Sequence, residues 1–134
     1  MANQLAVNLC GLELTSPVVL LSGCVGFGEE YTRVEGFSNR DTGAIVLKGT
    51  TKNPRLGNPP HRVWETPEGM LNAIGLQNPG VDKVVDEILP TLDFSETRFL
   101  ANVCGSTIDE YAEVTRRFDK SPIDGIEINI SCPN

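Results

Sequence analysis

Four short apolar segments recur along the chain, and a polar or glycine-rich stretch follows each of them. They occupy residues 17–21, 43–48, 99–103 and 125–130. Continuous apolar runs of this length are typical of strands that are buried on both faces, as in parallel sheets. Segments with helical spacing lie between them, so the sequence predicts an α/β fold with a parallel sheet and right-handed crossovers.

Apolar side chains recur every three or four residues in two of the intervening segments. The first spans residues 81–89 and ends before Pro90, which predicts a helix. The second is expected to open at Thr107 with a capping box that is completed by Glu110. The expected buried faces consist of Val81, Val84, Val85 and Ile88 in the first helix, and of Ile108, Tyr111, Val114 and Phe118 in the second.

Three further segments complete the expected order. Residues 5–14 alternate apolar and polar side chains on both sides of Cys10-Gly11, which predicts a small antiparallel hairpin. Residues 29–37 are expected to form a short helix. Residues 49–80 hold five prolines and the only tryptophan, and we expect a long functional loop. The resulting order suits the N-terminal half of a (β/α)8 TIM barrel preceded by a β-hairpin, since a whole barrel takes about 250 residues.

Charge and composition exclude several functional classes. The net charge of −7 argues against nucleic acid as a partner, because phosphate binding needs a basic surface. The longest apolar runs have four or five residues, so no membrane span is expected. No secretory signal is visible at the N-terminus. The four cysteines form no C-x-x-C pair and there is one histidine, so we expect no metal site and reduced thiols in the cytoplasm.

Polar side chains follow all four expected strands: Ser22, Lys48, Asn102 and Asn129. Because the carboxyl ends of parallel strands meet at one edge of a sheet, this pattern indicates a ligand site there. Lys48 has two interpretations. It either reaches solvent from a strand end or supplies a fixed cation to an anionic ligand or a flavin ring.

Three asparagines lie in two segments with apolar flanks: Asn72, Asn129 and Asn134. Each amide offers two donors and an acceptor, which match a ligand with alternating C=O and N–H groups such as a pyrimidine imide. Asparagines in loops also satisfy the backbone of turns, and that alternative stays open.

Cys132 follows the last expected strand and is a candidate proton acceptor. A free cysteine thiol ionises near pH 8.5, close enough to neutrality to exchange a proton where its surroundings help. Most cysteines are small buried apolar residues, which is the expectation for Cys10 and Cys104. Cys24 lies in a glycine-rich loop, and the sequence does not decide between a packing role and a functional role for it. His61 is expected at the surface.

Residues 70–78 (MLNAIGLQN) and 129–134 (NISCPN) closely resemble the dihydroorotate dehydrogenases of soluble class 1. Residues 22–31, 48–51 and 101–103 fit the same family in the same order, and the resemblance runs from about residue 5 to the last residue. The loop at Phe27-Gly28 and residues 65–78 look most like the catalytic subunit of the NAD-linked, two-subunit subclass (class 1B). The fumarate-using subclass is less similar.

The resemblance implies FMN at the carboxyl face of the barrel and the oxidation of dihydroorotate to orotate in pyrimidine (UMP) biosynthesis. It implies that Cys132 is the base. It also implies an electron-transfer subunit that carries FAD and an iron–sulfur cluster, and homo-oligomerisation. The implied substrate contacts are Lys48, Asn72, Ala73, Ile74, Gly75, Leu76, Asn129 and Asn134, and the implied FMN contacts are Ser22, Gly23, Lys48, Gly49, Asn102 and Asn129.

Residues 1–134 match only about the first four strands of such a barrel. The phosphate site that the loops after strands seven and eight usually form is not among them. We therefore expect a partial FMN-dependent domain that is inactive alone. Two alternatives remain: a non-catalytic half-barrel whose open edges self-associate, and a related FMN enzyme acting on free or tRNA dihydropyrimidines.

Overall fold

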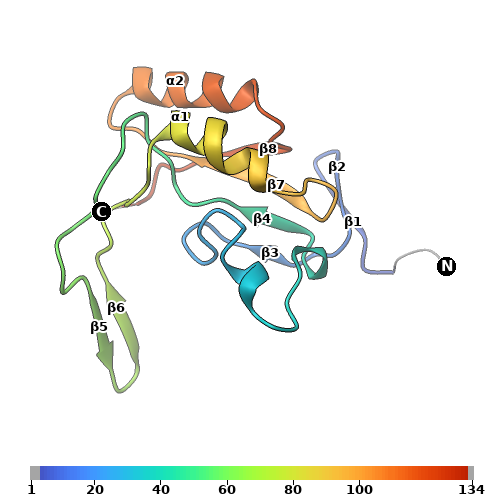
Figure 1. Ribbon diagram of the computed structural model, residues 1–134, viewed down its shortest axis with the longest axis horizontal. Coiled ribbons are helices and arrows are strands. Elements are labelled where there is room, and N and C mark those ends of the chain that lie inside the picture. The colour runs from blue at the N-terminus through green and yellow to red at the C-terminus, as the bar shows by residue number, and fades with distance from the viewer. Residues whose placement is uncertain (1–3, 133–134) are drawn as a thin grey trace.

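The centre of the molecule is a four-stranded parallel sheet with the strand order β3-β4-β7-β8 (Figure 1). A computed structural model describes residues 4–132 of the chain. The expected α/β class with a parallel sheet is confirmed. Each strand of this sheet falls inside the range expected from the sequence, except that β7 begins one residue earlier. The strands are β3 (Val19–Leu20), β4 (Ala44–Val46), β7 (Arg98–Val103) and β8 (Gly125–Ile128).

Two helical stretches lie side by side along one side of this sheet (Figure 1). In the first, α1 (Val81–Lys83) continues into the π-helical η3 (Val84–Ile88) and the 3-10 turn η4 (Leu89–Thr91). The second is α2 (Ile108–Asp119). Among residues 4–132, no helix has the length and apolar content that crossing a bilayer requires.

The hydrophobic core fills the space between these helices and one face of the sheet. In β7, alternate side chains point into the core, because successive residues of a strand face opposite sides. Phe99, Ala101 and Val103 are each 0% exposed. Burying one large apolar side chain contributes about 1.5–3 kcal/mol. The other core positions are Val25, Ile45, Leu47, Val81, Val84, Leu89, Val114 and Phe118.

The buried faces of the two helices differ from expectation at one position. Val81 and Val84 are buried, and Val85 and Ile88 pack against the core, as expected. Ile108 is 87% exposed. It is the first residue of α2, and the helix makes its buried contacts further along.

Only half of the expected capping box is present at α2. The Glu110 backbone N–H donates to Thr107 Oγ1 at 3.2 Å, but the Glu110 carboxylate accepts from the Ser106 N–H at 2.6 Å. A complete capping box joins Ser38 and Asp41 around the 3-10 turn η2 (Asn39–Asp41) instead. The short helix expected in residues 29–37 is reduced to the 3-10 turn η1 (Tyr31–Arg33).

Near the N-terminus, β1 (Val7–Leu9) pairs antiparallel with β2 (Leu12–Leu14). Two residues connect them, Cys10 with φ of 52° and Gly11 with φ of 94°. Positive φ at both central positions belongs to the turn whose twist matches a right-twisted strand pair.

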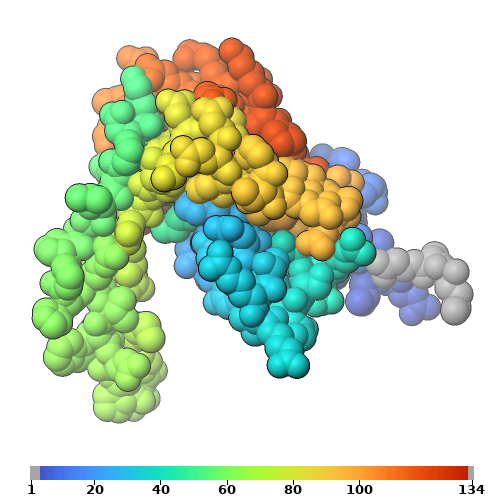
Figure 2. Space-filling view, in the orientation of Figure 1, coloured from blue at the N-terminus to red at the C-terminus, as the bar shows by residue number. Residues whose placement is uncertain are grey.

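The segment expected as one long loop, residues 49–80, contains an antiparallel hairpin. β5 (Val63–Thr66) pairs with β6 (Gly69–Asn72) across a two-residue turn. Pro67 and Glu68 form that turn, with glycine following, a sequence that favours a tight reversal. The hairpin projects as an arm from the rest of the molecule (Figure 2). It carries Asn72 back toward the carboxyl edge of the sheet.

Candidate functional site

Two cavities that share residues lie at the carboxyl edge of the sheet. We call the first the strand-end cavity, of about 360 Å³, and the second the loop cavity, of about 510 Å³. Both are lined by Ser22, Lys48, Leu76 and Cys132. The strand-end cavity is also lined by Leu21, Gly49, Asn102, Glu127, Ile128, Asn129, Ile130 and Ser131. The loop cavity is completed by Gly23, Cys24, Asn72, Ile74 and Gly75.

Most residues singled out from the sequence therefore meet at these two cavities. Ala73 lies apart from them. Its N–H donates to the Arg62 carbonyl at 2.8 Å, its carbonyl accepts from Asn58 Nδ2 at 2.8 Å, and it lines a different hollow beside the β5–β6 hairpin. Asn134 lies outside the described residues.

Lys48 directly follows β4 and lines both cavities. Its backbone N–H donates to the Gly26 carbonyl at 2.7 Å, which fixes the start of the side chain. The side chain is half-buried, and its ammonium makes no hydrogen bond or ion pair within residues 4–132. A cation held in this way is available to an anionic or strongly polar ligand.

Asn102 and Asn129 form a network across β7 and β8. Asn129 Nδ2 donates to Asn102 Oδ1 at 3.1 Å, and Asn102 Nδ2 donates to Glu127 Oε1. Asn102 is only 2% exposed, so its hydrogen bonds are needed to offset its desolvation. A Cβ on Gly49 would come within 2.9 Å of Asn102 Oδ1, and the glycine therefore leaves room for this amide.

The same network holds the segment that carries Cys132. Asn129 Oδ1 accepts from the N–H groups of Ser131 and Cys132, each at 3.3 Å. The Asn129 backbone is fixed in turn, because its N–H donates to the Val103 carbonyl at 2.9 Å and its carbonyl accepts from the Tyr111 hydroxyl. The segment that carries Cys132 therefore starts from a backbone position at the end of β8 that hydrogen bonds hold on both sides.

Two cysteines near this network differ in exposure. Cys132 is exposed on the cavity wall, whereas Cys104 is 2% exposed. Burial raises the pKa of the Cys104 thiol, Cys132 raises it further, and Lys48 and Asn129 oppose the shift. Cys104 therefore stays a neutral thiol over a wider pH range, which suits packing and not proton transfer.

The segment from Ile74 to Asn78 has a constrained backbone. Leu76 has φ of 53°, a region that is costly for a residue with a side chain and that is found at functional sites. Asn78 holds it there. Asn78 Nδ2 donates to the Leu76 carbonyl at 2.7 Å, and its Oδ1 accepts from the N–H groups of Thr51 and Gly80 at 3.1 Å and 3.0 Å.

Sequence reasoning missed three residues that shape the site: Asn78, Arg62 and Glu127. Arg62 bridges the two ends of the hairpin segment by donating to the carbonyls of Asn58 at 3.0 Å and Ile74 at 3.5 Å. The Asn78-Pro79-Gly80 run offered a turn signal, and Glu127 could have been found as a charge within an apolar strand. Arg62 gave no such signal.

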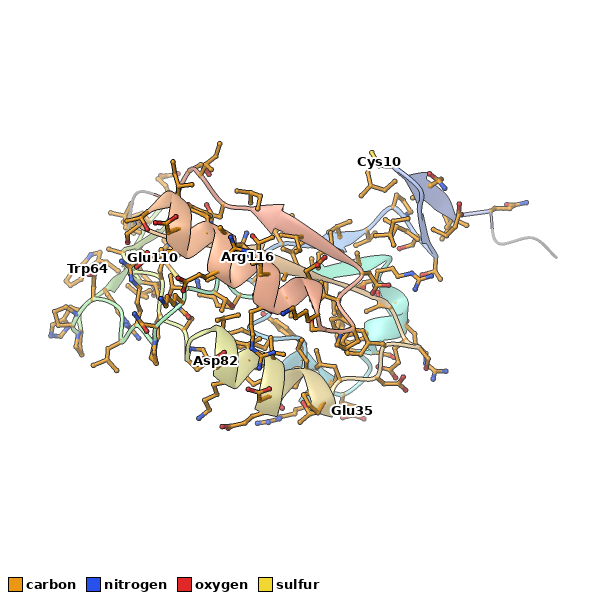
Figure 3. All side chains as sticks on the ribbon, turned by 90° about the horizontal axis from the view of Figure 1, so that it is seen from above. Cys10, Glu35, Trp64, Asp82, Glu110 and Arg116 are labelled. Carbon is orange, nitrogen blue, oxygen red and sulfur yellow. The ribbon has the colours of Figure 1, made fainter. Side chains whose placement is uncertain are left out.

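A third cavity, of about 290 Å³, lies at the opposite edge of the sheet, beside the start of β7, and is lined by none of the predicted site residues. Among residues 4–132, no three His, Cys, Asp or Glu side chains gather in a way that could hold a metal ion. Cys10 and Trp64 lie at opposite ends of the molecule (Figure 3). All predicted site residues except Ala73 and Asn134 line the two cavities at the carboxyl edge.

Comparison with known proteins points to one family. The family model described as dihydroorotate dehydrogenase matches residues 4–134. Relatives named "Dihydroorotate dehydrogenase B (NAD(+)), catalytic subunit" include those of Bacillus caldolyticus, 55% identical, and Geobacillus kaustophilus, 54% identical. Each match covers 98% of this chain and 42% of the relative, so the chain spans less than half the length of these proteins.

A solved structure is also similar. It is the crystal structure of a dihydroorotate dehydrogenase from Eimeria tenella in complex with ferulenol, with a TM-score of 0.74 and 25% sequence identity. The match covers 97% of this chain and 37% of that one.

Proposed function

Since the chain belongs to the dihydroorotate dehydrogenase family, we propose that it forms the first half of a (β/α)8 barrel that oxidises dihydroorotate to orotate in pyrimidine biosynthesis. One observation carries the proposal: side chains from the ends of all four parallel strands line the strand-end cavity. In barrels of this kind the active site lies at the carboxyl ends of the strands.

The residues present fit FMN as the cofactor. The Lys48 ammonium has no protein partner within residues 4–132, and the two amides of the network lie on the same cavity wall. A flavin ring offers acceptor and donor groups along one edge, which such groups can bind. When bound, FMN supplies the acceptor for a hydride. The residues proposed to hold it are Ser22, Gly23, Lys48, Gly49, Asn102 and Asn129.

The loop cavity suits the pyrimidine. Asn72 and Asn129 supply amides that match the imide edge of the ring, and Lys48 supplies a cation for its carboxylate. Asn134 joins this set on sequence resemblance alone. Ala73 takes a supporting place in the proposal because Arg62 and Asn58 hold its backbone. The remaining substrate contacts proposed are Ile74, Gly75 and Leu76.

Cys132 is the proposed base. Oxidation of dihydroorotate removes a hydride from one ring carbon and a proton from the adjacent carbon. Cys132 lines both cavities, so its thiolate can reach a substrate bound between the amides and the flavin. It takes the proton, while the two hydrogen bonds to Asn129 Oδ1 keep its segment at the end of β8.

The exposed area supports a partial barrel. The chain exposes 8634 Å², whereas a compact monomer of 14.5 kDa exposes about 6,900 Å². The excess of about 1,700 Å² is roughly twice the area of about 800 Å² that one partner buries in a standard protein interface. Leu21 and Ile128, on the two edge regions of the sheet, are 59% and 50% exposed. Further strand–helix units would cover both.

The names of the relatives support the proposed subclass and a partner subunit. Because they are named as catalytic subunits of an NAD-linked enzyme, we extend the proposal to an electron-transfer subunit carrying FAD and an iron–sulfur cluster. Homo-oligomerisation and a cytoplasmic location belong to the same proposal.

Flavin titration tests this function. We expect the isolated chain to bind FMN weakly and a mixture with the complementary half of the Bacillus caldolyticus relative to bind it tightly. Dihydroorotate should bleach the flavin absorbance of the mixture, and dihydrouracil and dihydrouridine should not. If dihydrouracil or dihydrouridine bleached the flavin and dihydroorotate did not, that compound would take the place of dihydroorotate as the proposed substrate. Tight, stoichiometric FMN binding with turnover by the isolated chain would contradict the half-barrel.

The excess exposed area also supports a second candidate, a non-catalytic half-barrel that self-associates through its open sheet edges. Sedimentation of the isolated chain distinguishes the two. A stable oligomer that gains neither FMN nor activity when the complementary half is added would favour self-association.

A further inference from the structure

Glu127 is an acidic side chain on the wall of the strand-end cavity, and no role was expected for it from the sequence. It lies in β8 with its Cα directly opposite Asn102 of β7. Its Oε1 accepts the hydrogen bond from Asn102 Nδ2. Within residues 4–132 it is the carboxylate that touches the amide network of the site.

The order of donors and acceptors in this network depends on that carboxylate. An amide side chain has an oxygen on one side and an NH2 group on the other, and an ionised carboxylate can only accept. Facing Glu127, Asn102 must therefore turn its NH2 group toward β8. Its oxygen is then left for Asn129 Nδ2, at 3.1 Å, and for the Cys104 thiol, at 3.4 Å.

The orientation of Asn102 also fixes that of Asn129, which holds the backbone at Cys132, the proposed base. Because Asn129 gives its NH2 group to Asn102, its oxygen faces the N–H groups of Ser131 and Cys132, both at 3.3 Å. If Asn102 were reversed, Asn129 would also have to reverse. Its NH2 group would then face two backbone donors, and both of those hydrogen bonds would be lost.

We propose that Glu127 is a positioning residue that sets the orientation of Asn102 and Asn129 and, through them, the backbone at Cys132. The role of Cys132 in this statement rests on the proposed function, whereas the orientation of the amides does not. Glu127 acts as a hydrogen-bond acceptor, so the property that matters is its oxygen and not its charge or its size.

Two substitutions separate these properties. Glu127→Leu keeps a similar volume and removes the acceptor. Glu127→Gln removes the charge and keeps an oxygen that can accept from Asn102, and the Ser131 and Cys132 N–H groups at the other end of the network favour that orientation of the new amide. Glu87→Leu is the matched control, because Glu87 is an exposed acid paired with Lys83 on the helical side. All are compared as flavin-loaded mixtures with the complementary half of the Bacillus caldolyticus relative.

The first measurement is NMR of the side-chain amides and of the backbone N–H of Cys132. We expect one sharp pair of signals from each of Asn102 and Asn129 in the unsubstituted protein and in Glu127→Gln. In Glu127→Leu these signals should double or broaden, and the Cys132 N–H should exchange faster with solvent. Unchanged signals in Glu127→Leu would overturn the proposal.

The second measurement is the rate of dihydroorotate oxidation. We expect kcat to fall about tenfold in Glu127→Leu, the effect of about one hydrogen bond, with the pH profile altered, and to return within about threefold in Glu127→Gln. An equal fall in both variants would assign the effect to charge and overturn the proposal. If the mixture that contains the unsubstituted chain does not oxidise dihydroorotate, the proposed function fails, and the amide signals still decide the role of Glu127.

Discussion

The two faces of the four-stranded sheet serve different purposes. The face toward the helices carries Phe99, Ala101 and Val103, all fully buried among apolar side chains. The opposite face carries Leu100, Asn102 and, on the neighbouring strand, Glu127, and it ends in the strand-end cavity. Because successive residues of one strand alternate between the faces, stability and chemistry are encoded in the same few residues of β7.

The largest expected effect tests this division on adjacent residues. Phe99→Ala should lower the free energy of unfolding by about 3–5 kcal/mol, since it removes a fully buried ring and leaves a cavity. Leu100→Ala, on the opposite face and only partly buried, should cost less than about 2 kcal/mol. Urea titration of both variants measures the difference. Equal losses would mean that the two faces are packed alike.

The next test concerns Cys132, whose removal should change the reaction rate and leave the free energy of unfolding almost unchanged. Cys132→Ala should lower kcat for dihydroorotate by about 10²–10⁴-fold in the flavin-loaded mixture with the complementary half, because the proton acceptor is lost. Its exposed position predicts a change in unfolding free energy within about 0.5 kcal/mol. Cys10→Ala, on the β1–β2 hairpin, is the control and should change neither quantity. Full activity in Cys132→Ala would show that Cys132 is not the proton acceptor.

Asn78 joins Leu76 on the cavity wall to Gly80, the residue before α1, and its removal should have an intermediate effect. Asn78→Ala leaves the N–H groups of Thr51 and Gly80 without their acceptor, which should cost about 1–3 kcal/mol. The constraint on Leu76 is released at the same time. Asn53→Ala, an exposed neighbour, should stay within about 0.5 kcal/mol. Thermal unfolding of the pair measures this, and similar melting temperatures would contradict it.

The smallest expected effect concerns the buried thiol. Burial raises the pKa of Cys104 above its ordinary value, so the unfolded chain loses this proton at a lower pH than the folded chain. The unfolded state then binds fewer protons, and stability falls as pH rises through that window. At pH values below the pKa of an unfolded thiol the contribution is fully present. Urea midpoints from pH 8 to 10.5 should decline in the parent and less steeply in Cys104→Ala, and parallel slopes would argue against burial as the cause.

Much of the candidate site was visible in the sequence. Ser22, Lys48, Asn102 and Asn129 could be picked out because each follows an apolar strand, and parallel strands end at a common edge. The β5–β6 hairpin was missed because prolines dominated the interpretation of its segment, although Pro67, Glu68 and Gly69 form a recognisable turn. Ala73 was expected at the substrate, yet its backbone is held by Arg62 and Asn58.

The sequence by itself determined the four strands of the parallel sheet, the two helical stretches that cover them and the edge at which the polar residues gather, because periodicity and strand-end position are local properties. Only the tertiary structure decided which polar groups touch. The contact between Glu127 and Asn102 depends on the register of β8 against β7, and a shift of one residue would turn either side chain to the other face. Register is set by the packing of the whole sheet, so no short stretch of sequence encodes it.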